Sequence, residues 1–366
     1  MTTRISTPIS NLADLGWTNF FLTQLDADEL AALAPARVMS VHRTKMDVMG
    51  CGPDQVPFEK TIMPFSEPDD PDDGSPGRAA TVGDWVLLDP VTGQAHRLLD
   101  RTSLFKRKVA GHERKEQLIA ANVDTLFVVT SCNQDFNVAR LERYLALAQD
   151  AGVTPVIILT KADLTDDPHT YEQQAMGLMP GIVVEILDAR DPDQIASLLP
   201  WCTTGQTVAF VGSSGVGKST LINTLTGQDT IETAGIREDD AKGRHTTTSR
   251  QFHRLRSGAW LLDTPGMREL QLTDVQDGID AVFADIVALA EDCRFKDCQH
   301  ETEPGCAVTA AINAGTLDPK RLHRWRKLAL EDQHNTQTIA ERRSREKSFK
   351  KMVKRTVAQK KRQRDD

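Results

Sequence analysis

The stretch "TVAFVGSSGVGKSTLINTLTG", residues 207–227, joins an apolar run to a helix-like run through a glycine-rich turn. It matches G-x-x-x-x-G-K-[ST], a pattern whose backbone N–H groups surround phosphate oxygens at a helix N-terminus. We therefore expect a phosphate-binding loop, with Lys218 on the β- and γ-phosphates of a nucleotide and Ser219 on magnesium. The predicted loop residues are Gly212, Ser213, Ser214, Gly215, Val216, Gly217, Lys218, Ser219 and Thr220.

A second segment, "WLLDTPGMREL" at residues 260–270, is typical of a strand that ends beside the phosphates. Asp263 is expected to hold magnesium through water, and the Gly266 N–H to meet the γ-phosphate. Between the two segments lies the polar stretch "GRHTTTS", residues 243–249. One of its threonines, Thr247 or Thr248, is expected to coordinate magnesium, and the sequence does not choose between them.

The base is predicted from "VIILTKADL", residues 156–164, a buried strand followed by a polar loop. The Asp163 carboxylate can accept hydrogen bonds from both N1–H and the 2-amino group of guanine, which adenine cannot offer. This favours GTP over the alternative of an ATP-driven enzyme. Lys161 would lie along the base. Thr160 stands where GTPases most often have Asn, so that side-chain contact is weakened or replaced.

The order of these segments is unusual, because the base-binding segment precedes the phosphate loop by about fifty residues. In a parallel sheet all such loops lie at the carboxyl ends of strands, so the site survives when the chain is cut and rejoined elsewhere. The sequence therefore predicts a circular permutation. A further base-contacting motif is indicated only by Asp188 and Ala189 of "EILDARD".

The composition, 39% hydrophobic in 366 residues, is that of a globular protein of several domains. No run approaches the ~20 apolar residues that span a bilayer, and the N-terminus has no apolar signal segment. We expect a cytoplasmic protein that does not associate with a membrane.

The pattern along the chain divides it into four parts. Short apolar alternations indicate a small β-barrel, and the later alternation of strands and helices indicates a doubly wound α/β domain. After that domain the chain is mostly helical. The predicted parts are an N-terminal extension (1–36), the barrel (37–112), the permuted nucleotide-binding domain (113–278) and a helical, metal-binding domain with a basic tail (279–366).

The helical region contains Cys293, Cys298, His300 and Cys306, spaced C-x₄-C-x-H-x₅-C. Three thiolates and one imidazole complete a tetrahedral zinc shell without an open position, so the predicted metal is structural.

The C-terminal tail is strongly basic within an acidic chain. Residues 342–364 hold twelve Lys and Arg against one acid, a local charge of +11, which leaves −19 for the remainder of a chain at −8. Phe349, Met352, Val353 and Val357 fall on one helical side among these lysines. One face of the tail can thus pack while the other meets phosphates, which favours RNA binding.

Taken together, these motifs resemble the ribosome-small-subunit-dependent GTPase A family, bacterial circularly permuted GTPases of late small-subunit assembly. The resemblance is carried by "TKADL" before "GSSGVGKSTLIN", then "GRHTTT", "LLDTPGMREL" and "CRFKDCQHETEPGCAV", with "VGDWV" upstream. It implies an N-terminal OB-fold, a permuted GTPase domain, a C-terminal zinc domain, and GTP hydrolysis stimulated by the 30S subunit with its 16S rRNA. The acidic loop at 66–78 and Thr160 depart from the family pattern.

The hydrolytic residue is not evident from the sequence. Ras-like GTPases place a water-orienting Gln after the D-x-x-G glycine, and this chain has Met267 there. A thioether cannot polarise water, so we expect slow intrinsic hydrolysis, with His245 positioning the water once a partner orders its loop. His245 as an ordinary solvent-exposed histidine is the alternative. At the level of function, a monomeric GTPase switch competes with a non-catalytic RNA-binding assembly factor in which GTP only tunes affinity.

Overall fold

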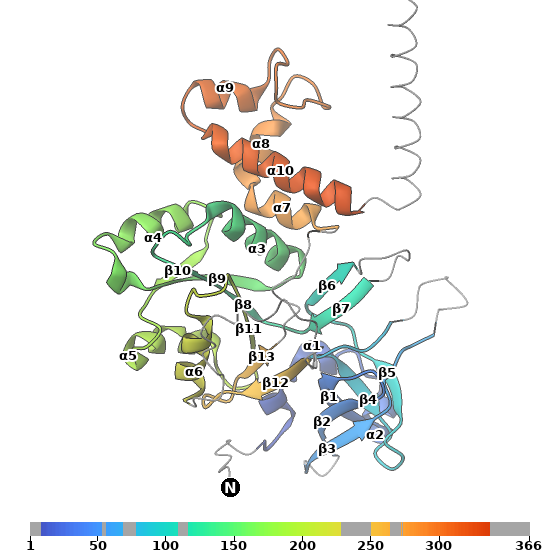
Figure 1. Cartoon of the computed structure of the whole chain (residues 1–366). Coiled ribbons are helices and arrows are strands. Elements are labelled where there is room, and N and C mark those ends of the chain that lie inside the picture. Colours follow the sequence, from blue (N-terminus) through green and yellow to red (C-terminus); the bar gives the residue numbers. More distant parts are fainter. Residues whose placement is uncertain are drawn as a thin grey trace, which may run out of the picture.

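The computed structural model describes residues 9–52, 56–68, 78–108, 116–227, 250–263, 272 and 274–336. Figure 1 shows a group of N-terminal strands, a central sheet between helices, and a C-terminal group of helices packed on the central part. None of the helices in these residues has the length and apolarity needed to cross a membrane.

The N-terminal part is rich in strands, as predicted. Its elements in the described residues are η1 (Leu12–Leu15), α1 (Asn19–Leu22), α2 (Ala27–Ala32), β1 (Ala34–Val41), β2 (Met46–Cys51), β3 (Pro57–Ile62), β4 (Trp85–Leu88) and β5 (Ala95–Leu98). The strands pair in the order β3-β2-β1-β4-β5, and all these pairs are antiparallel.

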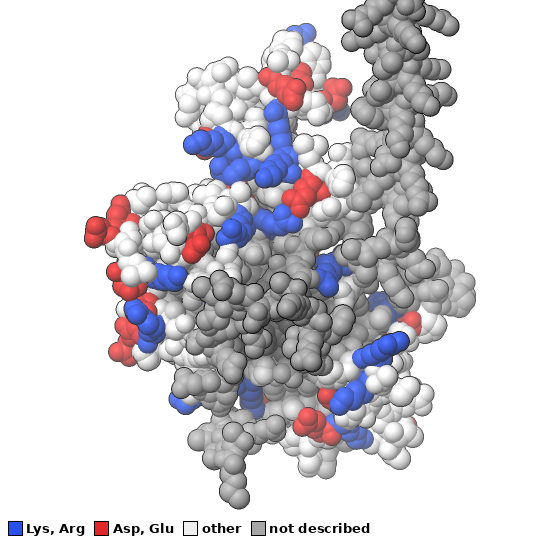
Figure 2. Space-filling model, in the orientation of Figure 1, with Lys and Arg blue, Asp and Glu red and all other residues white. Residues whose placement is uncertain are grey.

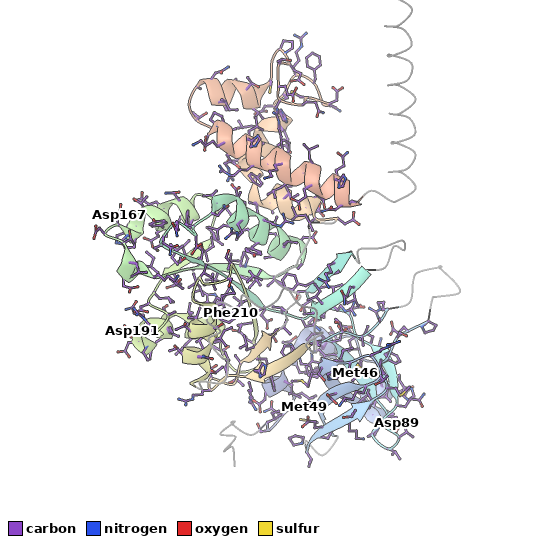
Figure 3. All side chains as sticks on the ribbon, viewed as in Figure 1. Met46, Met49, Asp89, Asp167, Asp191 and Phe210 are labelled. Atoms are coloured by element: carbon purple, nitrogen blue, oxygen red, sulfur yellow. The ribbon has the colours of Figure 1, made fainter. Side chains whose placement is uncertain are left out.

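Alternate side chains of these strands enter two different clusters, as the two-residue period of a strand requires. Val86 and Leu88 pack in an inner cluster with Met46, whereas Trp85 and Leu87 pack with the N-terminal helices. Met46 and Met49 of β2, labelled in Figure 3, likewise belong to opposite clusters. Both faces of this small sheet are thereby covered.

The central part is a sheet in which β10, β9, β8, β11 and β13 are parallel neighbours in this order, with β12 antiparallel beside β13. A separate hairpin of β6 and β7 precedes it. The elements are β6 (Leu104–Lys108), β7 (Glu116–Ala121), β8 (Thr125–Ser131), α3 (Val138–Asp150), β9 (Thr154–Thr160), η2 (Ala162–Leu164), α4 (Pro168–Met176), β10 (Val183–Ile186), α5 (Pro192–Ile195), η3 (Ala196–Trp201), β11 (Thr207–Val211), α6 (Lys218–Thr226), β12 (Arg250–Arg254) and β13 (Trp260–Asp263).

Helices cover both faces of this sheet, which confirms the predicted central α/β arrangement. On β8, Leu126 packs in one cluster with Leu145 of α3, and Phe127 packs in the other with Leu198 of η3. Phe210 of β11, labelled in Figure 3, lies with its ring centroid 4.9 Å from that of Phe127. Strands buried on both faces explain the continuous apolar runs in the sequence.

The N-terminal and central sheets are continuous, which the sequence pattern does not predict. β12 pairs with β1 in antiparallel register, Ser40 opposite Gln251. Beside this junction Arg37 of β1 is buried, and its guanidinium donates to the Leu15 carbonyl and to the Thr207 hydroxyl, each at 2.6 Å. Burial lowers the pKa of Arg37 to about 10. One arginine thus ties the N-terminal helices, β1 and the start of β11.

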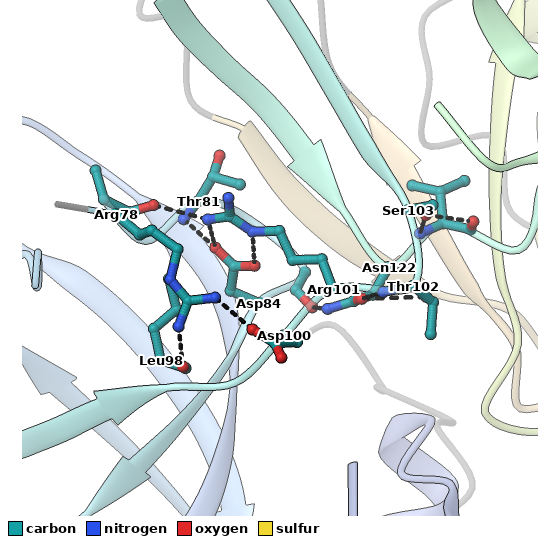
Figure 4. A network of polar contacts seen from close by, with 12 residues as sticks. Arg78, Thr81, Asp84, Leu98, Asp100, Arg101, Thr102, Ser103 and Asn122 are labelled. Atoms are coloured by element: carbon teal, nitrogen blue, oxygen red, sulfur yellow. Dashed lines mark hydrogen bonds and ion pairs between the residues drawn. The ribbon is translucent and has the colours of Figure 1, made fainter. Parts of the chain in front are cut away.

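A polar network fastens the same two parts near the start of β8 (Figure 4). The fully buried carboxylate of Asp84 accepts from Arg101 at 2.7 and 2.8 Å and from the Thr81 N–H at 2.7 Å. Burial raises the pKa of Asp84, and the Arg101 guanidinium opposes that shift. Asn122, which lies between β7 and β8, donates to the Gly83 carbonyl at 2.9 Å. The Asn122 bond and the pairing of β1 with β12 therefore join the N-terminal strands to the central sheet.

The C-terminal part consists, in the described residues, of α7 (Gln276–Val282), α8 (Ala284–Glu291), α9 (Ala307–Asn313) and α10 (Pro319–Thr336). Helix α7 packs closely on α3, because Gly278 leaves room there: a Cβ at this position would lie 2.1 Å from the Ala146 carbonyl oxygen. Helix α7 also spans residues 278 and 279, between which the sequence analysis divides the last two parts.

Candidate nucleotide site and metal centre

The predicted phosphate loop connects β11 to α6 at the carboxyl end of the parallel sheet. Gly212, Gly215 and Gly217 have φ values of 143°, 82° and 92°, which side chains with a Cβ rarely adopt. A Cβ on Gly212 would also lie 2.1 Å from the Val129 carbonyl oxygen. The glycines are therefore required by backbone conformation and by close packing.

Lys218 begins α6 and is almost buried, at 9% exposure. Its Nζ donates to the Gly212 carbonyl at 2.7 Å and also contacts the Ser213 carbonyl. The loop thus holds the ammonium group against its own carbonyls, at the point where helix α6 starts.

Thr160 ends β9 and contacts the phosphate loop directly. Its hydroxyl lies 2.6 Å from the Val216 carbonyl and 3.1 Å from the Thr130 carbonyl, and its single proton is best placed for the shorter contact. The predicted replacement for an Asn side chain is therefore a hydroxyl bond to the loop backbone. It connects the base-binding strand to the phosphate-binding loop.

The next residues of this segment form the 3-10 helix η2. Lys161 has a left-handed backbone, with φ of 58°, and the Asp163 side chain is 40% exposed. Asp163 Oδ2 accepts from Arg190 at 2.9 Å. Residues 188–190 follow β10, so the structure places the weakly indicated Asp188 and Ala189 beside the predicted guanine-binding residue.

Some predicted residues lie outside the described part of the chain: His245, Thr247, Thr248, Gly266 and Met267. Asp263 ends β13, and its backbone pairs with that of Gln251.

The structure adds two arginines that sequence reasoning missed. Arg140, in the first turn of α3, contacts the Ser213 hydroxyl in the phosphate loop, and Arg190 contacts Asp163. No motif marks Arg140. For Arg190 the usable signal is position, because it follows β10, the parallel neighbour of the strand β9 that precedes Asp163.

The four predicted metal ligands come together in the C-terminal part. The ligand atoms of Cys293, Cys298, His300 and Cys306 all lie within 4.8 Å of one another. The Cys293 and Cys306 sulfurs are 3.8 Å apart, and His300 Nδ1 lies 3.6 and 3.5 Å from them. Tetrahedral zinc requires separations of about 3.8 Å between sulfurs and about 3.6 Å between sulfur and nitrogen. The donor set and its spacing fit a structural zinc site.

Thr309 donates two hydrogen bonds to the sulfur of Cys306. Sγ accepts from the Thr309 hydroxyl at 3.2 Å and from the Thr309 N–H at 3.3 Å. Burial raises the pKa of the Cys306 thiol, but these bonds, together with those from His300 and Cys298, outweigh it and lower that pKa to about 6.

The loop that carries His300 is tied by one carboxylate. Glu303 accepts from the backbone N–H groups of Gln299, Glu301 and Thr302 at 2.8 to 3.0 Å. His300 itself has a left-handed backbone, with φ of 57°. These bonds hold the strained turn that directs the imidazole toward the cysteines.

The phosphate loop at the end of the central parallel strand β11, with the TKAD segment at the end of β9 two strands away in the same sheet, defines a P-loop nucleotide-binding protein of α/β fold. The family model described as RsgA GTPase matches residues 98–273, and that of the ABC transporter matches residues 201–352, a range that includes the same loop.

Curated relatives match over nearly the whole chain. A protein of Mesorhizobium japonicum named small ribosomal subunit biogenesis GTPase RsgA is 52% identical over 89% of this chain and 91% of its own. A Vibrio vulnificus relative, RsgA 2, is 49% identical over 93% of both chains. The chain belongs to the RsgA GTPase family, and it is a GTP hydrolase.

Two solved structures share the fold. YloQ, described as a circularly permuted GTPase, is 22% identical with a TM-score of 0.58 and covers 86% of this chain and 99% of its own. YjeQ from Thermotoga maritima is 20% identical with a TM-score of 0.53, and the match covers 81% of this chain and 97% of its own. These likenesses agree with the permuted order read from the sequence.

Proposed function

We propose that this GTPase binds the small ribosomal subunit, acts in its late maturation, and is stimulated by it to hydrolyse GTP. The observation that carries this proposal is the 52% identity, over 89% of the chain, to a relative named for small ribosomal subunit biogenesis. In this proposal the enzyme works as a cytoplasmic monomer and leaves the subunit after hydrolysis.

RNA contact is proposed at both ends of the molecule. Strands β1 to β5 are interpreted as an OB-fold, a barrel that commonly binds oligonucleotides. At the other end, basic side chains gather over the region of α10 and α3 in Figure 2. Helix α10 exposes Lys320 and Lys327, and the basic tail follows it in the chain. Contacts of this kind to 16S rRNA phosphates would give affinity with strong salt dependence.

For the nucleotide, we propose that Lys218 binds the β- and γ-phosphates, Ser219 binds magnesium, and Asp163 selects guanine over adenine. The remaining loop residues supply backbone N–H groups to the phosphates. Asp163→Asn should weaken GTP binding and improve binding of xanthosine triphosphate, whose base has a carbonyl in place of the 2-amino group. Unchanged GTP affinity in this variant would remove Asp163 from the site.

We propose that Cys293, Cys298, His300 and Cys306 hold one structural zinc ion. When bound, zinc would cross-link the loop before α9 to the end of α8 and so fold this part of the chain. Elemental analysis should give about one zinc per chain for the native protein and much less for Cys298→Ser. Protein purified without chelators and free of zinc would contradict the assignment.

For hydrolysis, we propose the roles that the sequence predicts for these residues. Asp263 and either Thr247 or Thr248 act on magnesium, Gly266 acts on the γ-phosphate, and His245 positions the attacking water that Met267 cannot orient. His245→Ala is expected to bind GTP and the subunit normally but to lose a factor on the order of 10² in stimulated turnover.

The deciding experiment measures GTP turnover with and without purified small subunits. Strong acceleration by small subunits, and none by large subunits, is expected. Equal turnover in both would favour the second candidate, an RNA-binding assembly factor in which GTP tunes affinity and hydrolysis is incidental.

A further inference from the structure

Three charged side chains meet at the carboxyl ends of β9 and β10. Arg190 donates from Nε to Asp188 Oδ1 at 2.9 Å and from one terminal nitrogen to Asp188 Oδ2 at 2.7 Å. The same terminal nitrogen donates to Asp163 Oδ2 at 2.9 Å. One planar guanidinium therefore links the predicted guanine-binding carboxylate to a second carboxylate in the loop after β10.

The loop that presents Arg190 is held in place by several independent contacts. The Ala189 carbonyl accepts from the Thr224 hydroxyl of α6 at 2.9 Å, and Ala189 is only 6% exposed. The Asp188 N–H donates to Gln194 at 2.9 Å. Since α6 begins in the phosphate loop, Arg190 is anchored to the same framework that holds the nucleotide phosphates.

Without Arg190, the negative charges of Asp163 and Asp188 would repel each other. Asp163 and Asp188 would then be two neighbouring carboxylates without a shared cation, and like charges repel. The Arg190 hydrogen bond lowers the pKa of Asp188, as expected for a carboxylate paired with a guanidinium. A carboxylate offers about four lone-pair sites, so Asp163 can keep Arg190 while it accepts two bonds from a base.

We propose that Arg190, anchored by Asp188, is a positioning residue that orients Asp163 for guanine recognition. This inference rests on the proposed role of Asp163. It assigns the Asp-Ala-Arg segment after β10 to the base site, and it makes base selectivity depend on an ion pair.

The test measures dissociation constants of fluorescent GDP and its inosine and xanthosine analogues for the full-length protein. Arg190→Ala should weaken GDP on the order of tenfold, and should reduce the preference for guanine over hypoxanthine, because the 2-amino bond depends on the direction of Asp163. Asp188→Asn should give a smaller effect of the same kind. Arg78→Ala, which breaks an ion pair in the N-terminal part, is the matched control. It should change neither the affinity for GDP nor the preference for guanine over hypoxanthine.

A double-mutant cycle separates this inference from the proposed site. In an Asp163→Ala background, Arg190→Ala should cause no further loss of base selectivity, since the two residues act through one contact. If Asp163→Ala alone leaves selectivity unchanged, both the base-site assignment and this inference fail. If Asp163→Ala reduces selectivity but Arg190→Ala does not, or tightens GDP binding, only the role of Arg190 is overturned.

Discussion

Glu142 of α3 and Arg324 of α10 form an ion pair, with Arg324 Nε donating to Oε2 at 2.7 Å, and the Glu142 side chain is fully buried. Arg321 approaches the other carboxylate oxygen at 3.4 Å and also pairs with Asp285 of α8 at 2.7 Å. One buried carboxylate of α3 is thus paired with the C-terminal helices, in addition to the apolar packing between α3 and α7.

Removing that carboxylate should weaken the attachment of the C-terminal part. Glu142→Ala leaves Arg324 without its counter-charge and leaves Arg321 with Asp285 alone, which is expected to destabilise the protein by about 3–5 kcal/mol. Chemical denaturation measures the loss. Arg143→Ala breaks the partly exposed pair with Glu331 and should cost at most about 1 kcal/mol. If both variants lost the same free energy of unfolding, the buried Glu142 network would contribute no more to stability than the exposed pair.

Replacement of glycine by alanine should lower the stability at one position and leave it unchanged or raise it slightly at another. Gly278→Ala places a Cβ 2.1 Å from the Ala146 carbonyl oxygen, so α7 must move and about 1–3 kcal/mol should be lost despite the better helix propensity. At Gly177, with φ of −74°, the nearest atoms to a Cβ are 3.5 Å away. Gly177→Ala should therefore be neutral or slightly stabilising. Thermal unfolding of both variants checks the contrast.

Asp150 should make stability depend on pH. Burial, with repulsion from Asp277, Asp332 and Asp274, raises its pKa to about 6 although Lys106 opposes the shift. The folded state therefore binds this proton more tightly than the unfolded chain, and stability falls as pH rises from about 4 to 6. Asp150→Asn removes that cost, so its unfolding temperature should exceed the native value more at pH 7.5 than at pH 4.5. The gain expected after solvent screening is about 1 kcal/mol.

Asp89 provides the control of opposite sign. It lies in the turn between β4 and β5, is labelled in Figure 3, and accepts from the Thr92 and Val91 N–H groups, which lower its pKa. Its contribution is present above the ordinary pKa and is lost as pH falls. Asp89→Asn should therefore bring no gain at pH 7.5, and a gain equal to that of Asp150→Asn would contradict the electrostatic explanation.

The Thr309 hydroxyl should increase the zinc affinity of the proposed site. Thr309→Val removes the hydroxyl that donates to Cys306 Sγ while the backbone donor stays, and loss of such a partner typically weakens metal binding 10- to 100-fold. Competition with a coloured chelator measures zinc affinity. Thr309→Ser keeps the hydroxyl and should bind zinc like the native protein. Tight binding by the valine variant would show that the hydroxyl has no part in it.

Thr160 should couple the base-binding strand to the phosphate loop. Thr160→Val keeps the shape of the side chain but leaves the Val216 carbonyl without its donor at 2.6 Å. We expect GDP and GTP affinity to fall by a factor of about 5–10. Thr160→Ser restores the hydroxyl and should bind nearly as well as the native chain, whereas two equally weak variants would point to packing alone.

The sequence by itself determined the features that depend on neighbouring residues. Residues 212–217 form the predicted glycine-rich turn before α6 because glycine conformation and the following helix are local properties, and the cysteines from 293 to 306 lie close enough in the chain to meet in one loop. The permuted order followed from the same reasoning, since every parallel strand presents its loop at one edge of the sheet.

Only the tertiary structure decided which distant side chains meet. Arg190 and Asp163 stand 27 positions apart, Glu142 and Arg321 stand 179 apart, and the pairing of β1 with β12 joins two parts of the chain separated by more than 200 residues. An arginine alone in a sequence is most simply read as a solvated surface charge. Its partner depends on how helices pack and strands align, and those long-range contacts are set by the whole folded chain, because no local pattern encodes them.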